Sequence, residues 1–283
     1  MADEYNVNEE ECTHDCSTCG ANCGGGASEP ESFLVPSNAN SKIKHVLGIV
    51  SGKGGVGKSF VCASLAVELS KKGYAVGVLD ADITGPSIQK MFGIEGTVEG
   101  SEFGIIPRET ANGIKIMSIN FLLEDPTQPV VWRGPMIADL VKQFWTEVVW
   151  GELDYLLVDM PPGTGDVPLT VFQSLPIDGA IIVTSPQSLV NMIVKKAYNM
   201  AKLMNIPILG IVENYSYFES PEGAKINIFG ESSIDEVAKE LELPVLGKLP
   251  IITRMAELSD KGQFEFTENV HLAKAIAEIE KLG

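Results

Sequence analysis

The 283-residue sequence has no apolar run near the roughly 20 residues that a membrane-spanning helix needs. Its N-terminus also lacks the positively charged segment that opens a secretory signal peptide. Basic residues are scarce: 21 Lys and Arg stand against 38 Asp and Glu, and the formal charge is -17. A chain this acidic repels nucleic acid and anionic membrane surfaces. We therefore expect a cytoplasmic protein that has neither nucleic acid nor membrane as a partner.

No cysteine follows Cys62, and the other four of the five cysteines, Cys12, Cys16, Cys19 and Cys23, crowd together near the N-terminus. This distribution excludes a disulfide framework across the chain and favours reduced thiolates that hold a metal. Four thiolates suit either zinc or a 4Fe-4S cluster. Three closely spaced cysteines with a fourth nearby are more typical of cluster ligation than of a zinc ribbon. The sequence therefore predicts an iron-sulfur site, with zinc as the alternative.

The composition of the chain changes near residue 42. The first 41 residues contain eight Asp and Glu, no Lys or Arg and a run of three glycines, which is typical of a flexible segment. From residue 42 onward, short apolar runs alternate with helical stretches. This pattern predicts an α/β domain over residues 42–283, in three layers, with a mostly parallel sheet and helices on both faces. The predicted buried strands are His45–Ser51, Ala75–Asp80, Ile114–Ile119, Tyr155–Asp159, Gly179–Thr184, Ile208–Glu213 and Pro244–Leu249.

Two further segments carry predictions about local structure. The connection over residues 95–113 is rich in Gly and polar residues, and the apolar pair Ile105 and Ile106 before a proline predicts a small hairpin there. The stretch over residues 271–282 has apolar residues on one face and mixed Glu and Lys on the other, without aromatic anchors. We expect this face to pack on the core rather than on a membrane.

The strand at His45–Ser51 leads into a glycine-rich loop and then into a helix-forming run. The loop reads Gly52-Lys53-Gly54-Gly55-Val56-Gly57-Lys58-Ser59, and in this strand-loop-helix context it predicts a P-loop. Glycines let successive backbone N–H groups point at a phosphate, and the helix N-terminus adds its positive dipole end. Lys58 is expected to reach the β and γ phosphates of ATP, and the Ser59 hydroxyl to ligate Mg2+. The predicted domain is therefore a P-loop NTPase fold.

Carboxylates follow two of the predicted strands. Asp159 ends the strand at 155–159, an arrangement that places an acid beside magnesium at the carboxyl edge of the sheet. Asp82 lies one step beyond the strand at 75–80, and it is the candidate for orienting the attacking water or a magnesium-bound water. For Asp80 the alternative to a functional role is a structural turn or cap. Asp166 precedes an apolar helical run, which is more typical of an N-cap.

Four segments in order carry a family resemblance: Lys53–Ser59, Asp80–Asp82, Asp159–Asp166 and Glu213–Phe218. With these, the chain resembles the Mrp/ApbC family of iron-sulfur cluster carrier ATPases, within the ParA/MinD group of deviant P-loop proteins. The resemblance covers residues 42–283. The run Pro161-Pro162-Gly163-Thr164-Gly165-Asp166 and the run Trp132-Arg133-Gly134-Pro135 separate the chain from ParA and MinD themselves.

The resemblance implies roles for individual residues. It implies an ATP-bound homodimer in which Lys53 reaches across the interface to the partner's phosphates, as a cation supplied in trans. It also implies that Asn214 hydrogen-bonds adenine and that Pro250 lies in the segment flanking the base. We assign no mechanism to Arg133.

The sequence departs from the family at one place. Most members carry a Cys-x2-Cys pair after the segment that corresponds to Asn214–Phe218, but here Ser220 and Gly223 replace the two cysteines. A cluster shared across the dimer at that site cannot form in the usual way. The flexible N-terminal tail of residues 1–41, with Cys12, Cys16, Cys19 and Cys23, then contains the remaining thiolate site.

The resemblance implies an ATP-binding, slowly hydrolysing carrier or scaffold that acts as a homodimer in the assembly of iron-sulfur proteins. Its partners would be recipient or scaffold proteins. The alternative is a ParA/MinD-like ATP-dependent positioning or adaptor switch without cluster transfer. Slow hydrolysis is expected because the sequence offers no dedicated general base beyond Asp82.

Overall fold

The computed structural model describes residues 34–82, 85, 87–123, 134–186, 190–220 and 222–283. Eight strands of this part form one sheet in the order β12-β9-β8-β1-β7-β2-β6-β5. All neighbouring pairs are parallel except β5 and β6. The strands of this sheet are β1 (Ser41–Val50), β2 (Val76–Asp80), β5 (Arg108–Glu109), β6 (Lys115–Ser118), β7 (Gly151–Asp159), β8 (Gly179–Thr184), β9 (Ile208–Glu213) and β12 (Val245–Lys248). The predicted mostly parallel sheet is confirmed.

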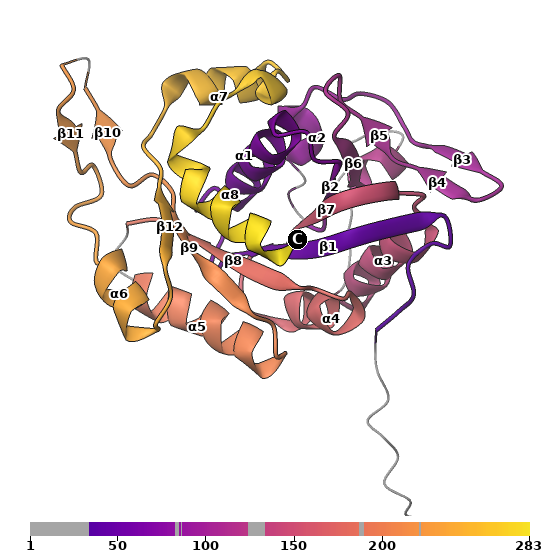
Figure 1. Ribbon diagram of the computed structural model, residues 1–283, viewed down its shortest axis with the longest axis horizontal. Helices are drawn as coiled ribbons and strands as arrows, with labels where there is room; N and C mark the ends of the chain where they lie inside the picture. Colours follow the sequence, from indigo (N-terminus) through magenta and orange to yellow (C-terminus); the bar gives the residue numbers. More distant parts are fainter. Residues whose placement is uncertain (1–33, 83–84, 86, 124–133, 187–189, 221) are drawn as a thin grey trace, which may run out of the picture. The chain divides into compact units, whose positions relative to one another are not determined.

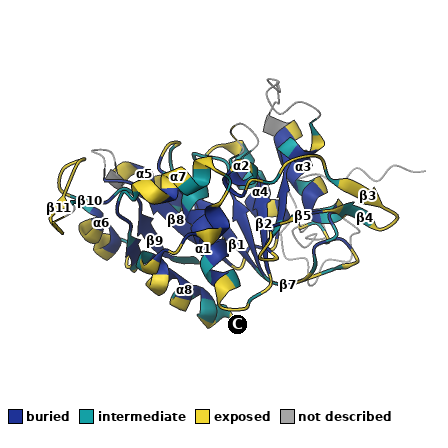
Figure 2. Cartoon of the chain, turned by 90° about the horizontal axis from the view of Figure 1, so that it is seen from above, coloured by how far each residue is buried: buried dark blue, intermediate teal, exposed yellow. Residues whose placement is uncertain are grey.

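Helices cover both faces of the sheet (Figure 1). Helices α1 (Lys58–Lys71), α2 (Ile88–Met91), α7 (Thr253–Asp260) and α8 (Ala273–Ile279) lie on one face. Helices α3 (Gly134–Glu147), α4 (Asp166–Ser174), α5 (Val190–Leu203) and α6 (Ile234–Glu240) lie on the other. Because the sheet is enclosed from both sides, β2 and β8 are buried along their whole length, as Figure 2 shows. This is why they appear in the sequence as continuous apolar runs without alternation.

The predicted strands lie where the sequence placed them, with small shifts at their ends. The largest shifts affect β1, which begins at Ser41 instead of His45, and β7, which begins at Gly151 instead of Tyr155. The two extensions pair with each other, from Ser41 opposite Gly151 to Ile43 opposite Leu153. The β1 extension alternates between half-buried and exposed residues, and in the β7 extension only Leu153 is buried. A search for continuous apolar runs therefore misses them.

The hairpin predicted over residues 95–113 is present. It consists of β3 (Glu99–Ser101) and β4 (Gly104–Ile106), which pair antiparallel, and β4 contains the apolar pair that indicated it. Strand β5 follows directly and joins the edge of the main sheet.

The C-terminal segment packs on the core as expected. Leu272, Ile276 and Ile279 are buried, and Leu282 packs against the same core. The helix itself is shorter than the apolar pattern indicates, because α8 is flanked by single 3-10 turns at Val270–Leu272 and Glu280–Leu282. No helix within the described ranges is long and apolar enough to cross a membrane.

The described part of the chain starts at residue 34, inside the segment of residues 1–41 that the composition predicts to be flexible. Val35 N donates a hydrogen bond to Ser174 O at 3.0 Å, and its carbonyl accepts one from the Trp145 indole at 2.9 Å. Asn38 Nδ2 donates to the carbonyl of Phe103 at 2.9 Å. Residues 34–40 are thus fastened to α3, to the end of α4 and to the β3–β4 turn.

Candidate functional site

The glycine-rich loop joins the end of β1 to the start of α1, as the P-loop pattern requires. Gly57 occupies the N-cap position of α1 with φ +78°, a left-handed conformation that favours glycine. A Cβ added there would lie 2.1 Å from Asn214 Nδ2, so the site also demands the absence of a side chain. Gly55 has φ +79° and no neighbour near an added Cβ, because it faces open space. The loop is therefore a backbone cradle that opens into a cavity.

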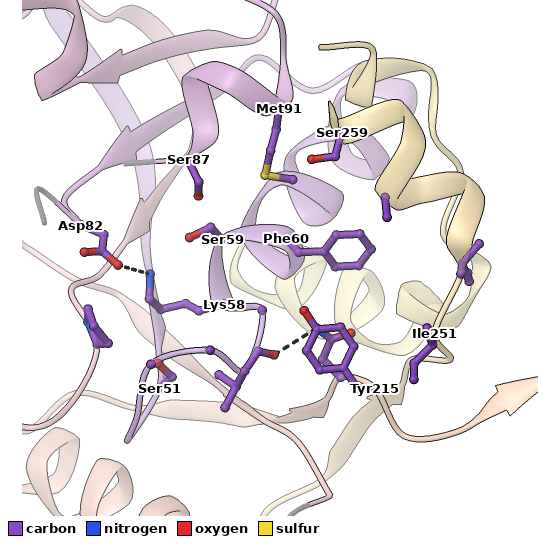
Figure 3. A pocket seen from close by; sticks show the side chains of 18 of the residues that line it. Ser51, Lys58, Ser59, Phe60, Asp82, Ser87, Met91, Tyr215, Ile251 and Ser259 are labelled. Carbon is purple, nitrogen blue, oxygen red and sulfur yellow. Dashed lines mark hydrogen bonds and ion pairs between the residues drawn. The ribbon is translucent and has the colours of Figure 1, made fainter. Parts of the chain in front are cut away.

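This cavity has a volume of about 600 Å3. Besides the loop, its walls come from the segment after β2, from α2, from the turn after β9, and from α7 with the residues before it. Figure 3 shows that its two ends differ in chemistry. Lys58, Ser59 and Asp82 lie at one end, whereas Phe60, Tyr215 and Ile251 lie at the other. A molecule with a charged end and a flat apolar end fits this arrangement.

The charged end is built around the buried side chain of Lys58. Its Nζ lies 2.6 Å from Asp159 Oδ1 and 3.7 Å from Asp82 Oδ2. Burial alone would lower the pKa of Lys58, but Asp159, Asp82 and Asp80 together raise it above its ordinary value. These carboxylates favour the charged form of Lys58 at the start of α1, where the helix dipole is also positive.

Burial raises the pKa of Asp159, and Lys58 opposes this effect. A side-chain hydrogen bond from Ser59 also lowers the pKa of Asp159, whereas Oδ2 of this carboxylate is buried and has no partner at hydrogen-bond geometry among the residues that the structure describes. An oxygen that is buried and unsatisfied calls for a further donor or a cation.

Asp80 proves to be a support for Asp82. It is fully buried, and its Oδ1 accepts the backbone N–H of Asp82 at 3.2 Å. Burial, with the nearby charge of Asp159, raises the pKa of Asp80 well above its ordinary value. This contact fixes the backbone at the start of the loop that carries Asp82, which matches the turn role considered for Asp80.

The polar end fits a magnesium nucleotide. Magnesium in such sites is bound by one or two carboxylates together with substrate phosphates, not by an all-protein cage. The described ranges contain no group of three or more His, Cys, Asp or Glu side chains that could hold a metal ion alone. Asp82 and Ser59 line the cavity, and Asp159 lies directly behind Lys58. These residues supply carboxylate and hydroxyl oxygens of the kind that magnesium prefers.

The apolar end is organised by Asn214, which follows β9 and is almost fully buried. Its Nδ2 donates to the carbonyl of Val56 at 3.0 Å, which ties the phosphate loop to β9. Its Oδ1 is buried and has no hydrogen-bond partner within the described part of the chain. The next residue, Tyr215, has φ +58°, an unusual conformation for a residue with a bulky side chain.

The structure brings most predicted site residues together. Those that line the cavity are Lys53, Gly54, Gly55, Val56, Gly57, Lys58, Ser59, Asp82, Asn214 and Pro250. Gly52 belongs to the same loop, and a Cβ added there would lie 2.4 Å from the carbonyl oxygen of Ile193 on α5.

Other predicted residues are not among the described residues that line the cavity. Cys12, Cys16, Cys19, Cys23 and Arg133 lie outside the described residues. Asp166 is not an N-cap: it is the first residue of α4, whose N-cap is Gly165.

The cavity also contains side chains that the sequence did not predict. No motif marks Phe60, Ser87, Met91, Thr253 or Ser259, because α2 and α7 reach the cavity only through tertiary packing. Of these residues, only Phe60 could have been inferred from its position in the sequence, because it directly follows the P-loop serine.

Ser220 and Gly223 form the turn between β10 (Phe218–Glu219) and β11 (Lys225–Ile226). Ser220 N donates to Ala224 O at 2.9 Å, and Gly223 N donates to Ser220 O at 2.9 Å. Gly223 has φ +81°, so the turn uses the conformational freedom of glycine at this position.

A parallel sheet whose first strand enters a glycine cradle with a buried lysine, beside carboxylates from two neighbouring strands, defines a P-loop NTPase. The chain belongs to the ParA family of P-loop proteins: a family model described as NUBPL iron-transfer P-loop NTPase matches residues 42–282. The fold, the phosphate loop and the matching family model all indicate a P-loop NTPase.

Individual proteins support this membership. The iron-sulfur cluster carrier protein of Methanocaldococcus jannaschii is 49% identical over 260 residues, which cover 89% of either chain. The protein of the same name from Clostridium perfringens is 48% identical over 231 residues, 79% of this chain and 81% of that one.

Solved structures give the same result. A nucleotide-binding protein from Archaeoglobus fulgidus in complex with ADP is 45% identical, with a TM-score of 0.74, over 82% of this chain and 91% of that one. The cell division ATPase MinD of Pyrococcus furiosus is 22% identical, with a TM-score of 0.60, over 85% of this chain and all of that one. The second likeness shows the shared fold alone.

Proposed function

We propose that this protein is an ATP-dependent iron-sulfur cluster carrier, whose cargo is a 4Fe-4S cluster held by Cys12, Cys16, Cys19 and Cys23. The observation that carries the proposal is the two-ended cavity on a phosphate loop, in a chain whose family is that of iron-transfer NTPases. The curated relatives carry the name of cluster carriers. The thiolates require a reducing compartment, for which we propose the cytoplasm.

The polar end would hold the phosphates and Mg2+. We propose that the backbone N–H groups of the glycine loop and the Lys58 ammonium bind the phosphates, while Ser59, Asp82 and Asp159 surround the magnesium ion. Magnesium neutralises charge on the transferred phosphoryl group. Lys58 lines the cavity beside Asp159 and Asp82, so the phosphates would replace these carboxylates as its partners when the carboxylates turn to the ion.

The apolar end would select adenine. Because Asn214 Nδ2 is committed to the Val56 carbonyl, the available atom of this side chain is an acceptor, Oδ1. The exocyclic amino group of adenine is a donor, whereas guanine presents a carbonyl oxygen at the same position. We therefore infer a preference for adenine nucleotides, with Pro250 in the wall beside the base.

The functional unit would be a homodimer that closes over the carboxyl edge of the sheet. Large apolar side chains are exposed where segments leave or enter this edge: Leu122 after β6, Met136 in the first turn of α3 and Met192 in the first turn of α5. A second copy that closed over this edge would cover these side chains. Lys53 stands in the loop at the same edge, where a second copy could receive it.

Mixing two inactive variants tests this arrangement. Lys53→Ala keeps an intact phosphate site, and Lys58→Arg keeps an intact Lys53. If Lys53 acts in trans, a mixed dimer contains one complete site, and an equimolar mixture should recover roughly a quarter of wild-type hydrolysis. A mixture as inactive as its components would contradict a role in trans. We expect slow turnover, because Asp82 is the one carboxylate among the described lining residues that lies beside Lys58, whereas the other, Asp260, comes from the end of α7.

Anaerobic reconstitution tests the cargo. The wild-type chain should bind iron and sulfide in excess of a Cys16→Ala, Cys19→Ala variant, with the absorption of a 4Fe-4S cluster. Cys62→Ala is the matched control, since Cys62 is buried in α1 and should not affect loading. Equal iron in wild type and the double variant would overturn the carrier proposal, and zinc in place of iron would replace the cluster by the alternative metal.

A second candidate is an ATP-dependent adaptor that has no transfer activity. The observation in its favour is the β10–β11 turn, where Ser220 and Gly223 offer no thiolate for handing a cluster to recipient or scaffold proteins. A loaded wild type that fails to activate an apo 4Fe-4S recipient, while still binding ATP, would favour the adaptor.

A further inference from the structure

We propose that Glu213 is a positioning residue that couples the base end of the nucleotide cavity to the β10–β11 hairpin. Glu213 is the last residue of β9 and is fully buried. Asn214 and Tyr215, which follow it directly, line the cavity. A buried carboxylate at this point needs hydrogen bonds, and the residues that supply them come from both ends of the hairpin.

Two serine hydroxyls satisfy this carboxylate. Ser216 Oγ donates to Glu213 Oε2 at 2.5 Å, and Ser232 Oγ donates to Glu213 Oε1 at 2.5 Å. Ser216 precedes β10, and Ser232 follows β11. The Glu213 side chain therefore binds both ends of the segment that contains the hairpin, Ser216 and Ser232. A carboxylate can do this because it has two acceptor oxygens.

The bond to Ser216 also spans the turn that presents Asn214 and Tyr215 to the cavity. Tyr215 has its left-handed backbone inside this turn, and such a conformation persists only where its surroundings fix it. On either side, Asn214 N donates to Thr184 O at 2.8 Å and Ser216 N donates to Leu249 O at 2.8 Å. A ligand that displaces the turn therefore also displaces Ser216.

A backbone ladder connects the hairpin to the opposite wall. Leu249 N donates to Glu213 O, and Ile251 N donates to Tyr217 O, each at 2.8 Å. Phe218 forms a parallel bridge with Ile251, which lines the cavity together with Pro250. The first strand of the hairpin is thus hydrogen-bonded to the segment beside the base.

None of the described residues between Ser216 and Ser232 lines the cavity. Within the described residues, the connection between the cavity and the hairpin therefore runs through the turn, the ladder and the Glu213 carboxylate. The inference rests on the nucleotide-binding part of the proposed function and is independent of the iron-sulfur cargo.

Hydrogen exchange of the full chain, followed by mass spectrometry with and without Mg-ADP, tests the coupling. In wild type, peptides over residues 217–226 should exchange about fivefold or more slowly when ADP is bound. In Ser232→Ala, ADP affinity measured by calorimetry should stay within about twofold of wild type, while the slowing at the hairpin disappears. A structural role alone would change exchange equally with and without ADP.

Control variants separate coupling from folding. Ser233→Ala is matched to Ser232→Ala, because the Ser233 side chain makes no cap hydrogen bond to α6; it should behave as wild type. Ser232 Oγ also accepts Ile234 N at 3.1 Å, so thermal unfolding of both variants records any general loss of stability. Glu213→Gln, which can accept one hydroxyl and donate to the other, should retain more of the coupling than Glu213→Ala.

The outcomes are distinct. Hairpin exchange that does not respond to ADP in wild type, or a full response in Ser232→Ala, overturns the coupling and leaves the nucleotide site intact. An absence of ADP binding in wild type overturns the nucleotide site itself, and the coupling with it.

Discussion

Two turns of this molecule use glycine in nearly the same backbone conformation, Gly57 in the phosphate loop with φ +78° and Gly223 in the β10–β11 hairpin with φ +81°. At Gly57, an added Cβ would meet Asn214 Nδ2 at 2.1 Å and the Tyr215 hydroxyl at 2.9 Å. At Gly223, nothing lies within 4 Å of an added Cβ. The first turn is constrained by conformation and by space, whereas the second is constrained by conformation alone.

This difference follows from what each turn contacts. The phosphate loop is pressed against Asn214 and Tyr215 so that its backbone can face a ligand, and Lys58 beside it is buried with carboxylates. The hairpin turn projects from the domain and closes with backbone hydrogen bonds of its own. The charged and polar groups are concentrated around the first turn, whereas the second is a tight turn that carries Ser220 and Gly223.

The largest expected effect comes from Lys58→Met. It removes the cation from a buried cluster that contains Asp159 and Asp80, so the unfolding free energy at neutral pH should fall by about 3 to 5 kcal/mol. Hydrolysis should be lost with it. The loss of stability should shrink as pH falls, because protonation neutralises the carboxylates that lost their partner. Chemical denaturation between pH 4 and 8, with Lys44→Met as the exposed control, measures this; equal losses in both variants would contradict the buried-charge argument.

Gly57→Ala should have the next largest effect. Left-handed strain costs about 1 to 2 kcal/mol, and displacement of Asn214 adds to it. ADP affinity should fall by at least about tenfold, because the same displacement disturbs both ends of the cavity. Calorimetric titration with ADP checks this, and unchanged affinity would show that the contact with Asn214 is not needed for binding.

Gly223→Ala is the matched change in the hairpin. The same left-handed conformation should cost about 1 kcal/mol, with no added steric term, since the space around the turn is open. ADP affinity should equal that of wild type. If Gly57→Ala and Gly223→Ala had the same effect on binding, the contrast between the two turns would fail.

The smallest effect is expected far from both turns, at Asp154→Asn. Asp154 Oδ1 accepts a hydrogen bond from Lys44 at 2.6 Å and Oδ2 one from Ala75 N at 2.8 Å, and these contacts lower the pKa of the carboxyl below 3.8. Since the folded pKa is the lower one, the contacts stabilise the protein above about pH 4, and this contribution is lost as pH falls through the folded value. The variant should be slightly less stable at pH 7 and equal to wild type in strong acid. Thermal unfolding at the two pH values compares them.

Much of the phosphate end was predictable from local sequence. The loop from Gly52 to Ser59 carries its chemistry in consecutive residues, and Asp159 and Asp82 were predicted because carboxyl ends of parallel strands share one edge. The residues Met91, Thr253 and Ser259 were not predicted, because α2 and α7 lie far along the chain from the loop and carry no motif. The strand extensions at Ser41 and Gly151 were missed for a similar reason: each is stabilised by the other.

The sequence by itself determined the class of fold, the phosphate loop and the absence of thiols at Ser220 and Gly223. These depend on residue type and on spacing along the chain. Only the tertiary structure decided that Asn214 holds the phosphate loop, that Asp80 supports Asp82, and that Glu213 joins the two ends of the hairpin. The physical reason is that a buried polar group takes its hydrogen-bond partners from whatever lies beside it in space, and local sequence does not contain that information.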